Sequence, residues 1–408
     1  MDLVIPYNLA KEEKRATIDD DLVASLVEPN SLPAYDPQQF YPERIGSYRD
    51  PIFKILRGRS SFSILVDDHT RPTPARFVIP ELLNIAEVSG VRDIRIVIAF
   101  GTHEHPPEEY LVEKVGRDVY SEFPIILHDA YSRKEHEMLG YTKFGTPLLI
   151  NRWVASSDVK ISVGSIFPSS LAGFTGGAKM VLPGVAYYES IDRNHSMFNE
   201  SFLGKVDGNP MRQDMEEAAR IAGLDLTIDS VLAPDGKVVS LHTGEPIGAH
   251  REGVKVSARV YEKRVPSAGI VVIGCGSTDD IDFIHLAKAL EVADLVCEEG
   301  GIIVMVGACT LGMRWQELTI ALRRDAGGET DSEVEVFSHL FIHRYSSIFL
   351  ERTKAVFWVT DPRHQDLALE MGFEFYGNLQ AAVDEAIRRK RNGITVLPRG
   401  SLLLPIPS

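Results

Sequence analysis

The stretch that decides the fold reads Arg92-Asp-Ile-Arg-Ile-Val-Ile-Ala-Phe100, followed by Gly101-Thr-His-Glu-His-Pro106. The first part is rich in β-branched residues and predicts a buried strand, and the second part is a polar loop. Similar short apolar runs that lead into polar residues occur at 63–67, 124–128 and 158–163. Amphipathic stretches such as 72–88, which has helical spacing, separate these runs. Strands that are apolar on both faces and alternate with helices indicate an α/β fold with a mainly parallel, doubly covered sheet.

Polar loops follow several of these predicted strands. In an open parallel sheet, ligands bind in the crevice beyond the carboxyl ends of the strands. This rule points to three loops, at 67–73, 101–106 and 164–179. We therefore expect the chemistry of this part of the chain to lie in these three loops.

A second α/β unit is predicted to begin near residue 266. Its predicted strands and helices lie at 269–274, 283–295, 301–306, 355–359 and 379–389. We predict two α/β domains with mainly parallel sheets, an N-terminal cofactor-binding domain at 1–265 and a smaller domain at 266–390, with the active site in the interdomain cleft. The strand-like tail at 391–408 is a candidate to return to the N-terminal domain.

The composition argues against several classes of protein. The 408 residues contain 43 Lys+Arg against 58 Asp+Glu, and a net charge of −15 argues against an electrostatic nucleic-acid binder. Three cysteines without a CxxC pair do not form a disulfide framework, which favours a reducing, cytoplasmic location. The longest apolar runs, such as 301–309, are too short to span a membrane, and residues 1–15 do not resemble a secretory signal. An oligomer is compatible with the sequence.

The first candidate loop gathers two carboxylates, a hydroxyl and a guanidinium between a predicted strand and a predicted helix. It reads Asp67-Asp68-His69-Thr70-Arg71. Arg71 is suited to clamp a carboxylate or phosphate near a helix N-terminus. In the alternative interpretation, Asp68 or Thr70 caps the helix while Arg71 pairs with an aspartate.

The other two loops carry a histidine and a lysine. His103 follows a buried strand and is a candidate general base, although a loop histidine is often only a surface residue. In the stretch 164–184, Gly173, Gly176 and Gly177 allow backbone amides to approach an anion, and Lys179 adds a charge or a nucleophilic amine. The stretch matches neither the Walker A pattern nor GxGxxG, so a glycine-rich turn without a chemical role is the alternative.

Together these motifs resemble one family. DDHTRPTP (67–74), GTH (101–103), AGFTGGAKMVLPG (172–184) and His195 are similar to the nickel-pincer lactate racemases and the wider family of 2-hydroxyacid racemases and epimerases. Further support comes from GNPMRQDMEEAA (208–219) and from the helix that carries Lys288. The likeness extends over nearly the whole length and keeps the motifs in family order.

The resemblance implies a cofactor and its ligands. The cofactor would be nickel held by pyridinium-3,5-bisthiocarboxylic acid mononucleotide, the nickel-pincer nucleotide, linked to Lys179 through a thioamide. His195 would complete the nickel ligands, so that Lys179 and His195 form the metal site; imidazole is a suitable nickel ligand. The residues implied for the rest of the cofactor are Asp68, Thr70, Arg71, Gly176 and Gly177, and those implied for the substrate are Arg71, His285 and Lys288.

The resemblance also implies a reaction and partners. His103 would take the hydroxyl proton of a small 2-hydroxyacid while the C2 hydrogen moves as hydride to the cofactor and then returns to the opposite face. Cofactor-assembly enzymes would be partners of the chain.

Two positions depart from the family pattern. The second acid/base of the family is a histidine ten residues before the lysine, where this chain has Ser169, and a serine hydroxyl is a poor base without an activating partner. His285 stands where a glutamine often precedes the family's lysine by three. For Ser169 we favour a changed, larger substrate; alternatively His69 or His105 supplies the second base, or the chain performs one-directional redox chemistry with the same cofactor.

Two further classes of function stay open at the level of sequence. One is a non-racemising cofactor carrier or sensor that kept the binding loops. The other is a phosphate-ester or nucleotide enzyme in which Asp67 and Asp68 would hold Mg²⁺, although the sequence around Lys179 argues against it.

Overall fold

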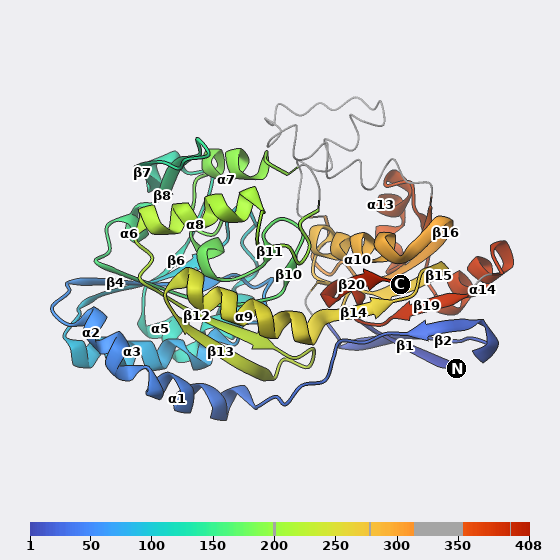
Figure 1. Ribbon diagram of the computed structural model, residues 1–408, viewed down its shortest axis with the longest axis horizontal. Helices are drawn as coiled ribbons and strands as arrows, with labels where there is room; N and C mark the ends of the chain where they lie inside the picture. Colours follow the sequence, from blue (N-terminus) through green and yellow to red (C-terminus); the bar gives the residue numbers. More distant parts are fainter. Residues whose placement is uncertain (199–200, 277–278, 314–353, 392) are drawn as a thin grey trace. The chain divides into compact units, whose positions relative to one another are not determined.

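The computed structural model describes residues 1–198, 201–276, 279–313, 354–391 and 393–408. The chain folds into two compact units (Figure 1). One unit contains Ser31–Arg259, and the other contains Met1–Asn30 and Val260–Ser408. We call them the 31–259 unit and the terminal unit.

The 31–259 unit is built on a six-stranded sheet. Its order is β13-β12-β9-β4-β5-β6, and the edge strand β13 runs antiparallel to β12 while the other neighbours are parallel. The strands are β4 (Ser61–Asp67), β5 (Asp93–Ala99), β6 (Ile125–Leu127), β9 (Val159–Ser165), β12 (Leu226–Leu232) and β13 (Val238–Gly244). Every residue of β4, β9 and β12 is buried, as expected for strands covered on both faces. The predicted mainly parallel α/β sheet is therefore confirmed.

Helices lie on both sides of this sheet. Figure 1 shows α1, α2 and α3 on one side and α8 on the other. The helices of the unit are α1 (Pro37–Ser47), α2 (Arg49–Leu56), α3 (Ile79–Ser89), α4 (Glu108–Val115), α5 (Arg117–Glu122), α6 (Arg152–Ala155), α7 (Tyr188–His195), α8 (Pro210–Ala222) and α9 (Pro246–Tyr261), whose last two residues belong to the terminal unit. Two short antiparallel pairs accompany them, β7 (His136–Tyr141) with β8 (Pro147–Asn151) and β10 (Pro168–Ser169) with β11 (Gly173–Phe174).

The strand order changes direction between β4 and β9. From β4 the chain adds β5 and β6 on one side, and later it adds β9 and β12 on the other. Such a switch point opens a crevice at the carboxyl ends of its two strands. The loops that begin after Asp67 and Ser165 are therefore the ones that flank this crevice.

The terminal unit contains a second six-stranded sheet, in which all neighbouring strands are parallel. Its order is β18-β17-β16-β15-β19-β3. The strands are β3 (Val23–Leu26), β15 (Ala268–Gly274), β16 (Cys297–Val306), β17 (Ala355–Val359), β18 (Glu374–Tyr376) and β19 (Ile394–Leu397). Among its described residues the α-helices are α10 (Phe283–Val296), α13 (Gln365–Glu370) and α14 (Leu379–Arg389), and further strand pairs are β1 (Asp2–Tyr7) with β2 (Glu12–Thr17) and β14 (Glu262–Val265) with β20 (Leu404–Pro407).

The two ends of the chain do not follow the expected domain division. The first 30 residues, expected in the N-terminal domain, belong to the terminal unit. Strand β3 pairs with β19, and Leu3 and Ile5 of β1 are buried in the core of that unit. The tail also stays there, because β19 pairs with β15 and β20 pairs with β14. The physical reason is that strands from both ends of the chain complete the parallel sheet beside β15.

One helix begins later than the sequence pattern suggested. The helical spacing at 72–88 predicts a helix from residue 72, but α3 starts at Ile79 after a short 3-10 turn at Ala75–Phe77. The turn follows Thr73, whose side chain joins two loops as described below. The three cysteines are free and buried, as expected. Within the described ranges, no helix combines the length and the apolar character needed to cross a bilayer.

Candidate active site

The three predicted loops meet at the carboxyl ends of the strands. Thr73 Oγ1 makes hydrogen bonds with Asp67 Oδ2 at 2.5 Å and with Ser165 Oγ at 2.7 Å, which joins the loops after β4 and β9. The Gly101 amide donates to the Gly184 carbonyl at 2.9 Å, which joins the loop after β5 to the end of the glycine-rich stretch. The structure therefore brings together the loops that the sequence selected.

Asp68 and His103 form a close pair. Asp68 Oδ2 lies 2.5 Å from His103 Nδ1, and Asp68 Oδ1 accepts hydrogen bonds from the amide and the hydroxyl of Thr70. Burial would raise the pKa of Asp68, but His103, with help from His69 and Arg71, lowers this pKa well below its usual value. The ionised carboxylate accepts the Nδ1 proton, so the lone pair of a neutral His103 ring is on Nε2. A base oriented in this way can take a proton from a substrate hydroxyl.

The neighbours of this pair decide between the two interpretations of the first loop. Asp68 accepts the amide of Thr70, as a capping residue would, but it does so in a turn rather than at the start of α3. Arg71 Nη1 donates to the Thr70 carbonyl at 3.1 Å. The Arg71 side chain is half-buried, and its charge contributes to the low pKa of Asp68. Capping of α3 by this loop is therefore not observed, whereas the nearness of Arg71 to Asp68 agrees with the other half of the alternative, in which Arg71 pairs with an aspartate.

Lys114 is a functional candidate that the sequence did not reveal. It is buried on α4, its Nζ lies 2.5 Å from Asp67 Oδ1, and it donates to the Arg71 carbonyl at 2.9 Å. Burial raises the pKa of Asp67, and the Lys114 charge opposes that rise. Lys114 thus offsets the charge of Asp67 and holds the backbone of the first loop. Its amphipathic helix gives no sequence signal for this role.

Gly176 and Gly177 lie against buried charged side chains. Both have positive φ, and a Cβ on Gly176 would lie 2.9 Å from Asp229 Oδ1, while one on Gly177 would lie 3.1 Å from Arg212 Nη2. The Gly177 amide donates to Asp229 Oδ2 at 2.9 Å. This amide is therefore used inside the protein rather than directed at an anion. Glycine is needed at both positions for close packing.

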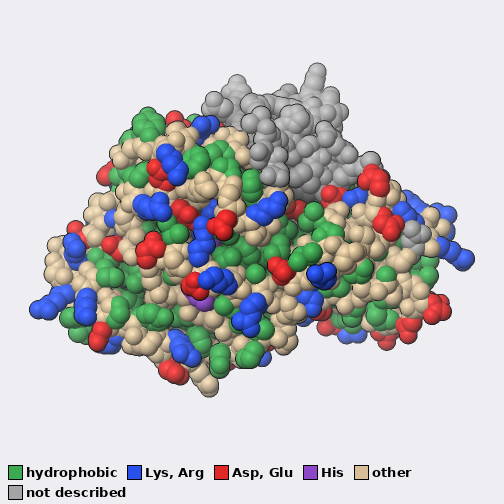
Figure 2. Space-filling model, in the orientation of Figure 1, with side chains coloured by type: hydrophobic (Ala, Val, Ile, Leu, Met, Phe, Trp, Pro, Cys, Tyr) green, Lys and Arg blue, Asp and Glu red, His purple; other side chains and the backbone are tan. Residues whose placement is uncertain are grey.

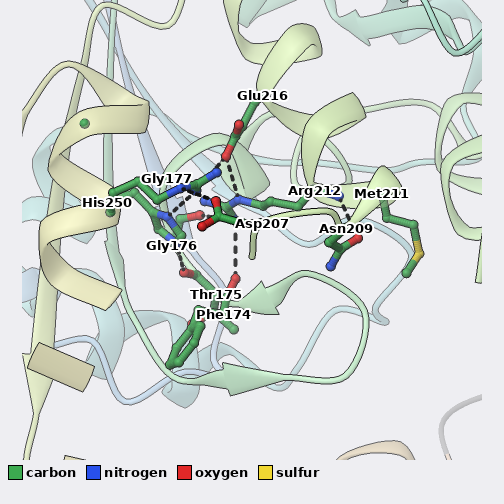
Figure 3. A network of polar contacts seen from close by, with 12 residues as sticks. Phe174, Thr175, Gly176, Gly177, Asp207, Asn209, Met211, Arg212, Glu216 and His250 are labelled. Carbon is green, nitrogen blue, oxygen red and sulfur yellow. Dashed lines mark hydrogen bonds and ion pairs between the residues drawn. The ribbon is translucent and has the colours of Figure 1, made fainter. Parts of the chain in front are cut away.

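Arg212 holds the carbonyl side of the same loop (Figure 3). Its Nη1 donates to the carbonyls of Phe174 and Gly176, both at 3.2 Å, and its Nε pairs with Glu216 at 3.2 Å. His250 Nε2 donates to the loop's Thr175 carbonyl at 2.9 Å. Burial lowers the pKa of Arg212 to about 10, so the guanidinium stays charged near neutral pH. The sequence motif at 208–219 contains Arg212 but does not show which backbone groups it binds.

Lys179 and His195 are the two residues expected to bind the metal and its carrier. Lys179 is half-buried on the 3-10 turn Gly177–Met180, and His195 is buried at the end of α7. Burial, the Lys179 charge and the His103 ring together lower the pKa of His195 to about 3. The His195 ring is therefore neutral near pH 7, which is the state that binds a metal. His103 and Lys179 are thus each near enough to His195 to affect it electrostatically.

The donor set gives a test of the expected cofactor. Among the described residues, no group of three or more His, Cys, Asp or Glu side chains could hold a metal ion. A metal held by the neutral His195 ring can take further ligands from a bound group. A nucleotide with two sulfur-bearing arms supplies such ligands, and the half-buried amine of Lys179 is a suitable attachment point. These residues fit the cofactor that the sequence implies.

Ser169 lies in the hairpin that leads into the glycine loop. It is buried in β10, pairs with Gly173 of β11, and its Oγ accepts the Ala172 amide at 3.4 Å. Of the two histidines considered as substitutes, His105 Nε2 donates to a backbone carbonyl at 2.9 Å. His69 lies near enough to Asp68 to lower its pKa.

The two expected substrate residues outside these loops belong to the terminal unit. His285 Nδ1 lies 2.7 Å from Asp282 Oδ1 in the first turn of α10. Lys288 Nζ lies 2.7 Å from Asp279 Oδ2 and is partly buried. Each of these side chains is thus held by a buried carboxylate.

Comparison with known proteins identifies relatives. The family model described as the lactate racemase N-terminal domain matches residues 9–203. A lactate racemase from Lactiplantibacillus plantarum is 28% identical over 380 residues, which cover 87% of each chain. A lactate racemase from Thermoanaerobacterium thermosaccharolyticum is 29% identical over 264 residues, covering 63% of this chain and 62% of the relative.

Solved structures share the fold. The lactate racemase apoprotein from Thermoanaerobacterium thermosaccharolyticum matches with a TM-score of 0.86 and 22% identity, covering 100% of both chains. A protein from Thermotoga maritima matches with a TM-score of 0.67 and 16% identity, covering 89% of this chain and 98% of the other. The chain is therefore similar in sequence to lactate racemases over most of its length, and its fold matches that of a lactate racemase apoprotein.

Proposed function

We propose that this protein is a racemase or epimerase that inverts C2 of a 2-hydroxyacid. The curated relatives are lactate racemases, which supports a racemase-type, isomerase activity. The observation that carries the proposal is the grouping of His103, Lys179 and His195, seen in the joint effect of His103 and Lys179 on the pKa of His195. A base, an amine and a neutral imidazole are the groups that this chemistry requires.

We further propose that Lys179 and His195 hold a nickel-pincer nucleotide. Lys179 would carry the covalent link, and His195 would supply a nitrogen ligand to nickel. When bound, this group supplies a nickel centre held by sulfur donors and an acceptor for the C2 hydrogen as hydride. Thr70, Arg71 and the backbone around Gly176 are the groups that we expect to bind its phosphate, since hydroxyls, guanidinium groups and amides all donate hydrogen bonds to phosphate.

In the proposed reaction, His103 is the general base that accepts the hydroxyl proton of the substrate and later returns it. Asp68 holds the ring through Nδ1, so Nε2 can accept the proton from the C2 hydroxyl and return it after inversion. The negative charge of Asp68 also stabilises the imidazolium that forms in between. Arg71 is the cation of the 31–259 unit proposed for the substrate carboxylate.

The proposed substrate is larger than lactate. Ser169 stands where the family resemblance implies a second histidine, and its side chain is smaller than an imidazole. We therefore expect a panel of 2-hydroxyacids, from lactate and malate to sugar acids such as gluconate, to give the highest kcat/KM for a longer acid. If His103→Ala changes no activity on the panel, a non-catalytic cofactor carrier is the better explanation.

Nickel content tests the proposed cofactor site. Protein produced together with cofactor-assembly enzymes should hold about one nickel per chain, as expected for a single metal centre. Lys179→Ala and His195→Ala should each lose the nickel, because one removes the covalent link and the other removes a ligand. Lys143→Ala, at an exposed lysine, is the matched control and should keep it. Full nickel occupancy in both site variants would contradict the assignment.

A further inference from the structure

Helix α8 carries buried polar residues that the proposed reaction does not use. It spans Pro210–Ala222 and begins after Asn209, whose Oδ1 accepts the Arg212 amide. Arg212 and Asp214 are both fully buried. Burying charged groups is costly unless they are well paired, so the partners of these two residues show what the helix does.

Asp214 is an acceptor for three buried donors from other elements. Thr142 Oγ1 donates to its Oδ1 at 2.5 Å, and Thr146 Oγ1 donates to its Oδ2 at 2.8 Å. The third donor is Asn194 Nδ2, which lies 2.8 Å from Oδ2. An ionised carboxylate can only accept hydrogen bonds, so the group that faces it from Asn194 must be the amide NH₂.

The orientation of the Asn194 amide is therefore fixed. Its Nδ2 donates a second hydrogen bond to the Met211 carbonyl at 3.0 Å, and this carbonyl is also only an acceptor. With both amide protons directed at α8, Asn194 Oδ1 is left on the side of His195. It lies 3.1 Å from His195 Nδ1, and an amide oxygen can only accept a proton from the ring.

The structure assigns to Asp214 the role of a positioning residue that acts through Asn194 to fix the proton of His195 on Nδ1. The lone pair of the neutral ring is then on Nε2, the nitrogen proposed to bind the metal. Histidines that bind metals commonly donate their other ring proton in this way, and removal of such an outer partner typically lowers metal affinity about 10- to 100-fold. The metal part of this inference rests on the proposed function, whereas the ring proton does not.

The same helix also holds the segment that carries Lys179. Arg212, two residues before Asp214, donates to the carbonyls of Phe174 and Gly176, as Figure 3 shows. One rigid element thus positions both residues proposed to hold the cofactor. This arrangement gives the motif at 208–219 a function in the site although it contributes no reacting group.

Nitrogen-15 NMR of the histidine side chains tests the inference on the protein without cofactor. The His195 signals are assigned by their loss in His195→Asn, and the spectra are recorded near pH 8, where the ring is neutral. The wild type should show protonated Nδ1 and unprotonated Nε2. Asn194→Leu and Asp214→Asn should lose this single tautomer and show a mixture. Ser196→Ala, at a residue beside His195 whose hydroxyl bonds to the Arg193 carbonyl, should keep it.

Two results would overturn the inference. One is a wild-type His195 with its proton on Nε2, which is decisive even if the variants fail to fold. The other is folded Asn194→Leu protein that keeps the Nδ1–H tautomer unchanged. On cofactor-loaded protein, Asp214→Asn should lose nickel to a chelator about 10- to 100-fold more readily than Ser196→Ala. If the wild type shows the predicted tautomer but holds no nickel after production with the cofactor-assembly enzymes, the positioning role is supported and the proposed cofactor is contradicted.

Discussion

Single buried partners set the chemical state of the residues proposed to react. The Asp68 carboxylate faces His103 Nδ1 at 2.5 Å, and the Asn194 amide oxygen faces His195 Nδ1 at 3.1 Å. Each contact places the proton of a neutral ring on Nδ1 and its lone pair on Nε2, which is proposed to accept a proton in His103 and to bind a metal in His195. The difference lies in charge, because a carboxylate stabilises a protonated ring and a neutral amide does not.

The first prediction at this scale concerns Asp68. Asp68→Asn should lower kcat by at least about 100-fold on the best 2-hydroxyacid of the panel, because the neutral amide neither fixes the His103 proton as firmly nor stabilises the imidazolium. KM should change much less, since Asp68 is proposed to act on His103 rather than on the substrate. Steady-state kinetics check this, with Asp118→Asn on α5 as the control. An unchanged kcat in Asp68→Asn would rule out the proposed base.

The sequence could single out His103 and Lys179 as candidates because each lies in a loop after a predicted strand, and it added His195 through the family resemblance. It could not predict the partners that fix the positions of the histidine ring protons. For His195 these are Asp214 and Asn194, which are 20 residues apart and meet only in the folded chain. The glycines show the same limit. Gly177 is identified by its motif, but its amide binds Asp229 instead of facing an anion.

Residues 174–177 of the glycine-rich stretch that carries Lys179 are held in place by side chains from several elements. Arg212 of α8 and His250 of α9 bind its carbonyls, and Asp229 of β12 binds the Gly177 amide. Burial raises the pKa of Asp229 to about 7, which shows how far this carboxylate is removed from water. The loop that carries Lys179 is therefore held by buried polar contacts and has little room for added side-chain atoms.

Alanine substitutions at two glycines test this packing. Gly176 and Gly208 have similar positive φ, +82° and +76°, but nothing lies within 4 Å of a Cβ on Gly208, whereas one on Gly176 would lie 2.9 Å from Asp229 Oδ1. Gly208→Ala should cost about 1–2 kcal/mol for its backbone conformation alone. Gly176→Ala should cost clearly more and lower nickel loading. Urea unfolding and nickel analysis check this, and equal unfolding free energies for the two variants would contradict the proposed packing.

Most elements could be predicted from the sequence because their patterns are strong. The buried runs at 63–67, 92–100 and 158–163 all lie in or overlap strands of the parallel sheet. The start of α3 could not be predicted from spacing, because Thr73 is used in contacts with Asp67 and Ser165 that depend on the folded sheet.

At the scale of the whole molecule, strands from the two ends of the chain lie side by side in one sheet. Strand β3 pairs with β19, so residues near 25 and near 395 become neighbours in one sheet. Sequence patterns describe each strand but carry little information on such distant pairing, which is why the first 30 residues were expected in the other unit. Acidic and basic side chains are intermingled on the face shown in Figure 2.

The stability of the molecule should depend on pH through His128. This ring is fully buried, and burial, together with the nearby His136, lowers its pKa from 6.5 to about 3. Between pH 6.5 and 3, His128 is protonated in the unfolded chain but neutral in the folded chain. The free energy of unfolding therefore falls as the pH is lowered through this range. From pH 7.5 to pH 5 this contribution is about 2 kcal/mol.

His128→Asn removes this dependence and keeps a neutral polar side chain. Urea unfolding at both pH values should show that the wild type loses about 2 kcal/mol more than the variant on acidification. Identical losses in the two proteins would mean that His128 is not held neutral by burial.

The fate of the C2 hydrogen tests the central claim most directly. Nickel-loaded protein is incubated with one enantiomer of the best 2-hydroxyacid, deuterated at C2, in ordinary water. The account predicts an inverted product that keeps deuterium at C2, because the hydrogen is expected to leave and return as hydride without exchange. Inversion with loss of the deuterium to solvent, or no inversion of any acid on the panel, would contradict it.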